Sequence, residues 1–324
     1  MNIPVYPPPI QPKRQRLTVF FMLMMACSFI QLVPVFAVLM VVLEKPLYQL
    51  LKAMEAGQIS EETFSQMLTA MMEWWMDKPI VTIATLFGTA GIVGVFVIWQ
   101  LTMRQRPLSE WGIKGGKKGI AQYVLGLVLG CALFSGAVLF IWAMNGAKLE
   151  LTGQVNWMYF ALFFCAFLVQ GFEEEFLLRG FLLHSLKERM SPFWAVLISS
   201  VVFALMHISN SGISFVALLN LTLFGVFAGM LVLKTGNLWC AAAIHSTWNF
   251  VQGSVWGCLV SGIDVGGGIF TYTPDANRTL TNGGLFGPEG GLGVTLVLIF
   301  GIFVLAWLSL PKSQKKAKSK GSEE

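Results

Sequence analysis

The sequence from residue 119 to residue 145 reads GIAQYVLGLVLGCALFSGAVLFIWAMN and contains no Asp, Glu, Lys or Arg. Because an α-helix of about 20 apolar residues crosses the roughly 30 Å hydrocarbon core of a bilayer, this run predicts a transmembrane helix. The whole chain of 324 residues has the same character, since 55% of it is hydrophobic and only 12% is charged. Soluble domains carry roughly 25% charged residues. The composition therefore excludes water-soluble, collagenous, disordered and nucleic-acid-binding proteins.

Further apolar runs, separated by Pro, Gly and charged residues, predict an all-α polytopic bundle of about eight transmembrane helices. We expect this bundle to form a single integral-membrane domain over residues 1–324. The segment 44–79 is expected to be an amphipathic helix at the outer interface or a packed loop helix, and the glycine-rich stretch 262–290 an outer loop. The predicted spans lie at about 17–43, 80–102, 119–145, 156–186, 191–209, 212–233, 237–259 and 291–310.

Lys and Arg are distributed unevenly between the predicted spans. They concentrate before the first span, in the segment 103–118 and in the tail 311–324. By the positive-inside rule these segments face the cytoplasm, so we expect a multi-pass protein of the plasma (inner) membrane with both termini cytoplasmic. The lysine-rich tail is expected to contact the headgroups of the lipid bilayer.

Ionisable side chains inside membrane spans are costly, and they usually serve a function. This chain concentrates them on three of its predicted spans, and the set includes all of its histidines. His184, near the cytoplasmic end of its span, is expected to be structural. The candidate site residues are Glu173, Glu174, Glu175, Arg179, Phe203, His207, His245 and Asn249.

Helical geometry sorts the acidic residues, because each residue turns about 100° around the helix axis. Glu175 and Arg179 are four residues apart, so they share a face and are expected to form an ion pair. Glu174 points about 100° away and is left without a basic partner. A buried carboxylate of this kind suits a general base. Glu173 is expected to line the same cavity in neutral form or to bond to a neighbouring helix.

The i, i+4 spacing recurs on the two other helices. It places His245 and Asn249 on one face of a helix, and it places the ring of Phe203 where it can orient the imidazole of His207. A carboxylate, two histidines and an amide can activate water and stabilise an oxyanion, as peptide hydrolysis requires. The same residues would also fit an ion or solute pathway or a structural brace between helices.

The order of these residues along the chain is similar to a known motif set. Residues 174–179 read EEFLLR and match EExxxR, residues 203–207 match FxxxH, and residues 245–249 match HxxxN. The set resembles the CPBP (CAAX protease and bacteriocin-processing, or Abi) family of intramembrane proteases, whose best-known members are the type II CAAX prenyl endopeptidases. The resemblance covers a motif-bearing core at about 156–255.

The resemblance implies a helical-bundle membrane peptidase whose catalytic cavity opens toward the cytoplasm. Glu174 and His207 would activate the attacking water. His245 and Asn249 would polarise the scissile carbonyl and hold its oxyanion, and the ion pair of the first motif would support the site. The substrate would be a peptide or another membrane protein, and the sequence indicates no oligomeric state.

The family resemblance leaves the cofactor open, because both metal-dependent and metal-independent mechanisms have been described for its members. Two histidines and a carboxylate are a known catalytic zinc set, here Glu174, His207 and His245. However, the chain lacks an HExxH motif, and Asn249 suits oxyanion binding better than zinc binding. We therefore expect that no cofactor is required, with zinc as the alternative. A non-catalytic immunity or scaffold relative and a proton-coupled transporter are the competing functions.

Overall fold

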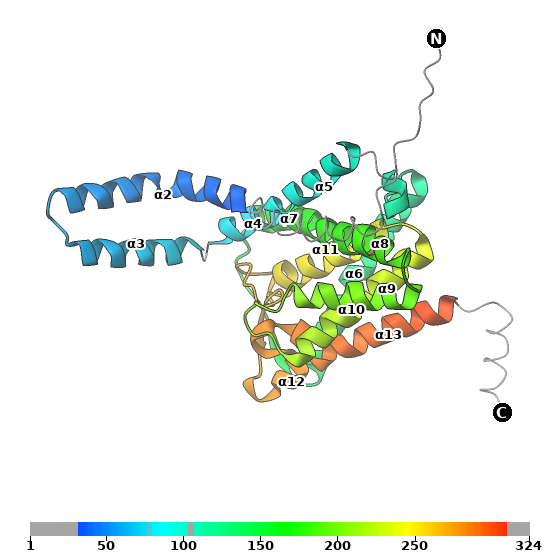
Figure 1. Cartoon of the computed structure of the whole chain (residues 1–324). Helices are drawn as coiled ribbons and strands as arrows, with labels where there is room; N and C mark the ends of the chain where they lie inside the picture. Colours follow the sequence, from blue (N-terminus) through cyan, green and yellow to red (C-terminus); the bar gives the residue numbers. More distant parts are fainter. Residues whose placement is uncertain (1–31, 77, 103–106, 310–324) are drawn as a thin grey trace, which may run out of the picture. The chain divides into compact units, whose positions relative to one another are not determined.

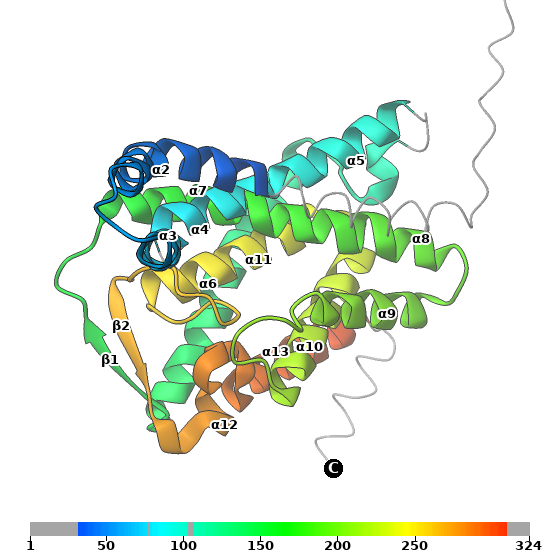
Figure 2. The same ribbon diagram turned by 60° about the vertical axis from the view of Figure 1, so that its left-hand side comes forward.

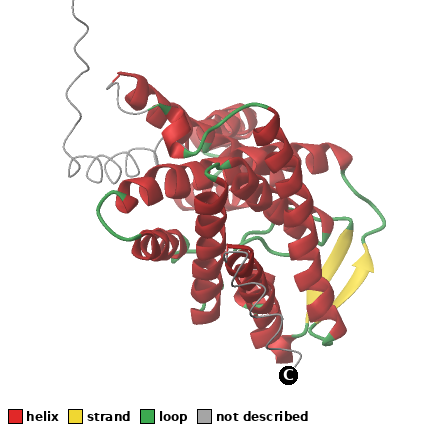
Figure 3. Cartoon of the chain, turned by 90° about the vertical axis from the view of Figure 1, so that its right-hand side faces the viewer, coloured by secondary structure: helices red, strands yellow, loops and turns green. Residues whose placement is uncertain are grey.

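The computed structural model describes residues 32–76, 78–102 and 107–309. These residues form an all-α protein with a single pair of short strands in the described part (Figures 1 and 3). Two compact units can be distinguished among the described residues, one within residues 1–105 and 156–173 and the other within residues 106–155 and 174–324. The helices of the first unit are α2 (Leu32–Glu55), α3 (Glu61–Met76), α4 (Pro79–Gly88), α5 (Ala90–Thr102) and most of α7 (Trp157–Glu175).

The second unit contains the remaining helices, both strands and two π-helical segments. Its main elements are α6 (Lys117–Ala143), β1 (Ala147–Leu151), the π-helical η2 (Phe176–Leu182), α8 (Leu183–Lys187), α9 (Pro192–Leu205), α10 (Phe215–Thr235), α11 (Trp239–Phe250), the π-helical η3 (Val251–Val255), β2 (Phe270–Pro274), α12 (Thr279–Asn282) and α13 (Leu292–Ser309). Short 3-10 turns lie at Leu108–Trp111, Ala276–Arg278, Gly284–Phe286 and Pro288–Gly290.

Five helical stretches in the described part of the chain are long and apolar enough to cross a membrane. They are Leu32–Glu55, Pro79–Ile98, Lys117–Ala143, Phe215–Thr235 and Leu292–Ser309. The protein is therefore a polytopic membrane protein, although the expected number of about eight spans is not confirmed. The predicted spans that carry the polar motifs correspond to shorter or interrupted helices, namely α7 with η2 and α8, α9, and α11 with η3.

In the first unit, α2 and α3 lie side by side as a helical hairpin (Figure 1). The predicted boundary at residue 43 is wrong, because α2 continues through Pro46 to Glu55. A proline inside a helix removes one backbone hydrogen bond, and buried apolar side chains of α2 and α4, which include Leu39, Leu43 and Val81, hold this helix in place. The predicted helix over 44–79 is accordingly divided between the end of α2, a turn and α3. Residues 17–31 of the first predicted span lie outside the described residues.

In the second unit, two glycines allow α6 to lie directly against α11, the helix that carries His245. A Cβ atom added at Gly126 would lie 2.5 Å from the carbonyl oxygen of Cys240, and one added at Gly130 would lie 2.5 Å from that of Ile244. Such small-xxx-small spacing lets membrane helices approach backbone to backbone. The position of α11 is therefore set by close contact with α6.

Two glycines four residues apart also allow α10 to pack closely against α9, the helix that precedes His207. A Cβ atom at Gly225 would lie 2.6 Å from Cβ of Ser200, and one at Gly229 would lie 3.1 Å from Val196. Helix α13 covers another side of α10 (Figure 2). The helices that carry the second and third motifs are thus each fixed by a glycine-lined contact.

The strands β1 and β2 pair antiparallel, from Ala147 opposite Pro274 to Leu151 opposite Phe270 (Figure 2). The stretch 262–290, predicted as a loop, therefore contains a strand and several short helices. Asn282 secures this connection, because its Nδ2 donates to the carbonyl oxygens of Gly146 at 2.7 Å and Asp275 at 2.8 Å. The strand pairing and the bond from Asn282 to Gly146 join residues more than a hundred positions apart, so no local pattern indicates them.

Candidate active site

The first and third motifs lie where an α-helix changes to a π-helix. Glu174 and Glu175 end α7, and Arg179 lies in η2, which follows at once. Asn249 lies near the end of α11, which continues as η3. Such π-helical turns are rare and occur frequently at functional sites. Both motif-bearing helices therefore have irregular backbone beside the polar residues.

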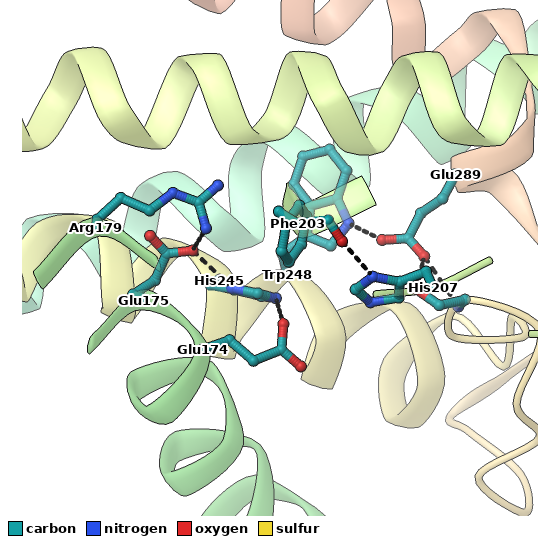
Figure 4. A network of polar contacts seen from close by, with 9 residues as sticks. Glu174, Glu175, Arg179, Phe203, His207, His245, Trp248 and Glu289 are labelled. Atoms are coloured by element: carbon teal, nitrogen blue, oxygen red, sulfur yellow. Dashed lines mark hydrogen bonds and ion pairs between the residues drawn. The ribbon is translucent and has the colours of Figure 1, made fainter. Parts of the chain in front are cut away.

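The ion pair expected within the first motif is present. Arg179 Nη1 donates to Glu175 Oε1 at 3.0 Å, and both side chains are completely buried, with 0% exposure (Figure 4). The same carboxylate oxygen lies 3.0 Å from Nδ1 of His245. Because an ionised carboxylate only accepts hydrogen bonds, Nδ1 of His245 carries a hydrogen. Glu175 therefore fixes both the guanidinium and the orientation of the His245 ring.

The expectation that Glu174 has no basic partner is wrong. Its Oε2 lies 3.7 Å from Nε2 of His245, so this imidazole lies between the two carboxylates (Figure 4). The partner comes from α11, and helical periodicity within the first motif could not reveal it. With His245 protonated, the cluster of Glu174, Glu175, Arg179 and His245 has no net charge. A neutral sum is the least costly state for buried charges.

The ring of Phe203 joins the three motifs. Its centroid lies 4.9 Å from the ring of His207 and 5.7 Å from the ring of His245, and Arg179 Cζ lies 4.8 Å above it. Nδ1 of His207 donates to the backbone carbonyl of Phe203 at 2.9 Å, because a carbonyl only accepts. In the neutral His207 ring, Nε2 is then the proton acceptor. Both candidate catalytic histidines therefore lie against one aromatic ring and are oriented through the nitrogen Nδ1.

The other predicted residues lie as follows. Asn249 is one turn beyond His245 on α11 and is buried. Glu173 is also buried, and it belongs to the first unit, whereas Glu174 belongs to the second. Nδ1 of His184 donates to the carbonyl of Arg179 at 2.7 Å, which is a backbone contact of the kind expected of a structural histidine.

The alternative zinc site of the sequence analysis consists of Glu174, His207 and His245. Across residues 32–76, 78–102 and 107–309, no three His, Cys, Asp or Glu side chains form a group that could hold a metal ion. Glu174, His207 and His245 therefore do not converge as a ligand set.

Three residues at the site were missed by sequence reasoning. The ring of Phe224 lies 4.9 Å from the ring of His245, and Nε1 of Trp248 donates to Oε1 of the buried Glu289 at 3.1 Å. Phe224 is one of many apolar residues of α10, and Trp248 falls between the fixed positions of the third motif. Glu289 lies in the glycine-rich stretch, where its charge alone does not distinguish it from a solvated loop residue.

The family model described as Rce1-like, type II CAAX prenyl endopeptidase Rce1-like, matches residues 156–251. This segment contains all three motifs. A comparison with curated proteins finds no match. The family predicted from the motifs, that of the Rce1-like CAAX prenyl endopeptidases within the CPBP proteases, is therefore confirmed over residues 156–251 of this polytopic membrane protein.

Proposed function

We propose that the protein is an intramembrane endopeptidase that hydrolyses a peptide bond with a water activated by Glu174 and His207. The observation that carries the proposal is the convergence of the three motifs on Phe203, with His245 between the two carboxylates of the first motif. Two imidazoles lie against one ring, and the carboxylate of Glu174 lies 3.7 Å from one of them, so these side chains can act together as acids and bases. The substrate is a peptide or a membrane protein, and the site opens to the cytoplasm.

Glu174 is assigned as the principal base. Its side chain is 14% exposed, whereas that of Glu175 is 0% exposed and already engaged by Arg179 and His245. A water molecule can therefore reach Glu174 more readily. The unprotonated Nε2 of His207 is a second acceptor for the same proton. A positioned general base accelerates such a step by roughly 10²–10⁴-fold.

Binding of the oxyanion is assigned to His245 and Asn249. In the protonated state that neutralises the cluster, His245 has an Nε2–H group, and the Asn249 side chain supplies an amide donor on the same face of α11. Donors held in place before the reaction stabilise the charge that develops on the carbonyl oxygen. The protein holds the His245 ring in advance through Glu175.

The proposed reaction has two steps. The water oxygen bonds to the carbonyl carbon while one water proton passes to Glu174, which gives a tetrahedral intermediate with a negative oxygen. The negative oxygen then re-forms the carbonyl double bond as the carbon–nitrogen bond breaks, and the proton on Glu174 passes to the departing nitrogen. The products are a carboxylic acid and an amine, which ionise to a carboxylate and an ammonium group. This sequence requires neither a cofactor nor a tightly bound zinc ion.

A proteomic comparison tests the assignment and identifies the substrate. Membranes from cells that carry the native protein are compared with membranes that carry E174Q or the matched control E150Q, which changes an exposed glutamate on β1 in the same way. We expect a cleaved peptide in the native and E150Q samples and none in the E174Q sample. Identical peptide sets in all three samples would favour a non-catalytic scaffold or immunity relative.

A further inference from the structure

Glu289 is a buried carboxylate in the connection that precedes α13, beyond the segment matched by the family model. Its side chain uses both oxygens. Oε1 accepts from Nε1 of Trp248 at 3.1 Å (Figure 4). Oε2 accepts from the backbone N–H of Ser261 at 2.9 Å and from its hydroxyl at 2.7 Å. All three of these donors are neutral. A buried carboxylate held by neutral donors is costly compared with an apolar contact, so its presence calls for a specific role.

One side of this carboxylate holds α11. Trp248 lies three residues after His245 and one residue before Asn249. Its buried ring contacts the ring of Phe134 at 5.1 Å and that of Phe224 at 5.6 Å, and Phe224 in turn contacts the ring of His245. Rotation of α11 about its own axis would break the bond between Trp248 and Glu289. This bond therefore fixes the direction in which α11 presents His245.

The other side of the carboxylate holds the turn that follows His207. The carbonyl of Ser261 accepts from Nδ2 of Asn210 at 2.9 Å, and the backbone N–H of Asn210 donates to the carbonyl of His207 at 3.0 Å. Ser261 has a φ of 49°, a left-handed conformation that non-glycine residues adopt rarely. The two hydrogen bonds from Ser261 to Glu289 stabilise this conformation. Glu289 is therefore linked to the backbone of His207 through Ser261 and Asn210.

We propose that Glu289 is a positioning residue that sets the spacing between His245 on α11 and His207 in the turn that follows α9. It contacts neither imidazole and acts through Trp248 on one side and Ser261 on the other. The inference rests on the proposed function, in which one imidazole accepts a proton while the other stabilises the oxyanion. A misplacement of about 1 Å between reacting groups can lower the rate by roughly 100-fold.

The test compares E289Q with N220A. The amide of E289Q cannot accept from both Trp248 and Ser261, since its NH₂ group must face one of these donors. N220A removes the bond from Asn220 Nδ2 to the backbone carbonyl of Glu289 and leaves the carboxylate unchanged. Both variants loosen the same connection, but only E289Q changes the positioning contacts. W248F, which keeps an aromatic ring and removes the indole N–H, serves as a second variant if E289Q does not fold.

Two readouts separate positioning from general destabilisation. The first is peptide cleavage, where we expect E289Q and W248F to lower kcat at least tenfold and to change KM by less than twofold. We expect N220A to keep the kcat of the native protein even where it loses as much thermal stability as E289Q. The second is ¹⁵N NMR of the three histidines, where we expect E289Q to shift the ring signals of His207 and His245 and to leave those of His184 in place.

The proposal is overturned if E289Q leaves the two imidazole signals unchanged, or if the variants lose kcat only in proportion to their loss of stability. The NMR readout does not depend on proteolysis. If the native protein cleaves no substrate and E289Q still shifts His207 and His245, the positioning role stands and the proposed endopeptidase function fails.

Discussion

Replacement of Arg179 by Met should destabilise the protein in a strongly pH-dependent way. Arg179 is completely buried, and its Nη1 forms the ion pair with Glu175 at 3.0 Å. Met keeps an unbranched apolar chain and removes the positive charge. The variant would leave the buried Glu175 and the partly exposed Glu174 with only His245 as a compensating cation. Removal of one partner of a buried ion pair typically costs about 3–5 kcal/mol.

The folded R179M variant is expected to bind an extra proton at its two glutamates. Since Glu175 has no exposed surface, the variant relieves the charge imbalance by taking up one proton in the folded state. Placing a proton on a glutamate side chain in water costs roughly 4 kcal/mol at pH 7 and about 1 kcal/mol at pH 5. The lost contact between the guanidinium and the ring of Phe203, 4.8 Å away, adds roughly 1 kcal/mol that does not depend on pH.

We therefore expect R179M to lose about 5 kcal/mol of unfolding free energy at pH 7 relative to the native protein, and about 2 kcal/mol at pH 5. The loss is smaller at pH 5 because the folded variant binds one more proton than its unfolded chain, so a fall in pH stabilises the folded state. The double variant E175Q/R179M removes both charges and should lose only the pH-independent part.

Equilibrium unfolding in mixed micelles at the two pH values measures these differences. The control is K148M, which removes the charge of an exposed lysine on β1 and should leave the unfolding free energy nearly unchanged at both pH values. The reasoning is refuted if R179M loses as much stability at pH 5 as at pH 7, or if the double variant is no more stable than R179M at pH 7.

Three further outcomes are expected. Gly126→Ala should lower both stability and cleavage, because its Cβ would lie 2.5 Å from the backbone of α11, whereas Gly136→Ala on the same helix meets nothing within 4 Å and should have little effect in thermal unfolding and peptide assays. Purified protein should contain well under one zinc ion per chain and keep most of its activity after chelator treatment; stoichiometric zinc, with activity lost on its removal and restored on its return, would contradict this. In intact cells whose native cysteines have been replaced, cysteines introduced at Gln58 and Thr281 should react with an impermeant maleimide and one at Ser319 should not; labelling at Ser319 alone would reverse the topology.

The local features of the sequence were reliable guides to the membrane class, the helical fold and the ion pair of the first motif. Apolar runs indicate membrane helices because the bilayer requires a minimum length, and residues four apart on a helix must lie on one face. The same local reasoning placed a boundary before Pro46, where α2 continues. It also missed the pairing of β1 with β2, which joins residues 147–151 to residues 270–274.

The sequence by itself determined which polar residues lie on each helix and which of them share a face. Only the tertiary structure decided that His245 lies between Glu174 and Glu175, that Phe203 contacts both imidazoles, and that the candidate zinc ligands do not form one group. It alone revealed the buried contacts of Glu289. The physical reason is that helical periodicity fixes the direction of a side chain around its own axis, whereas the partner it meets depends on which helix packs opposite and at what rotation.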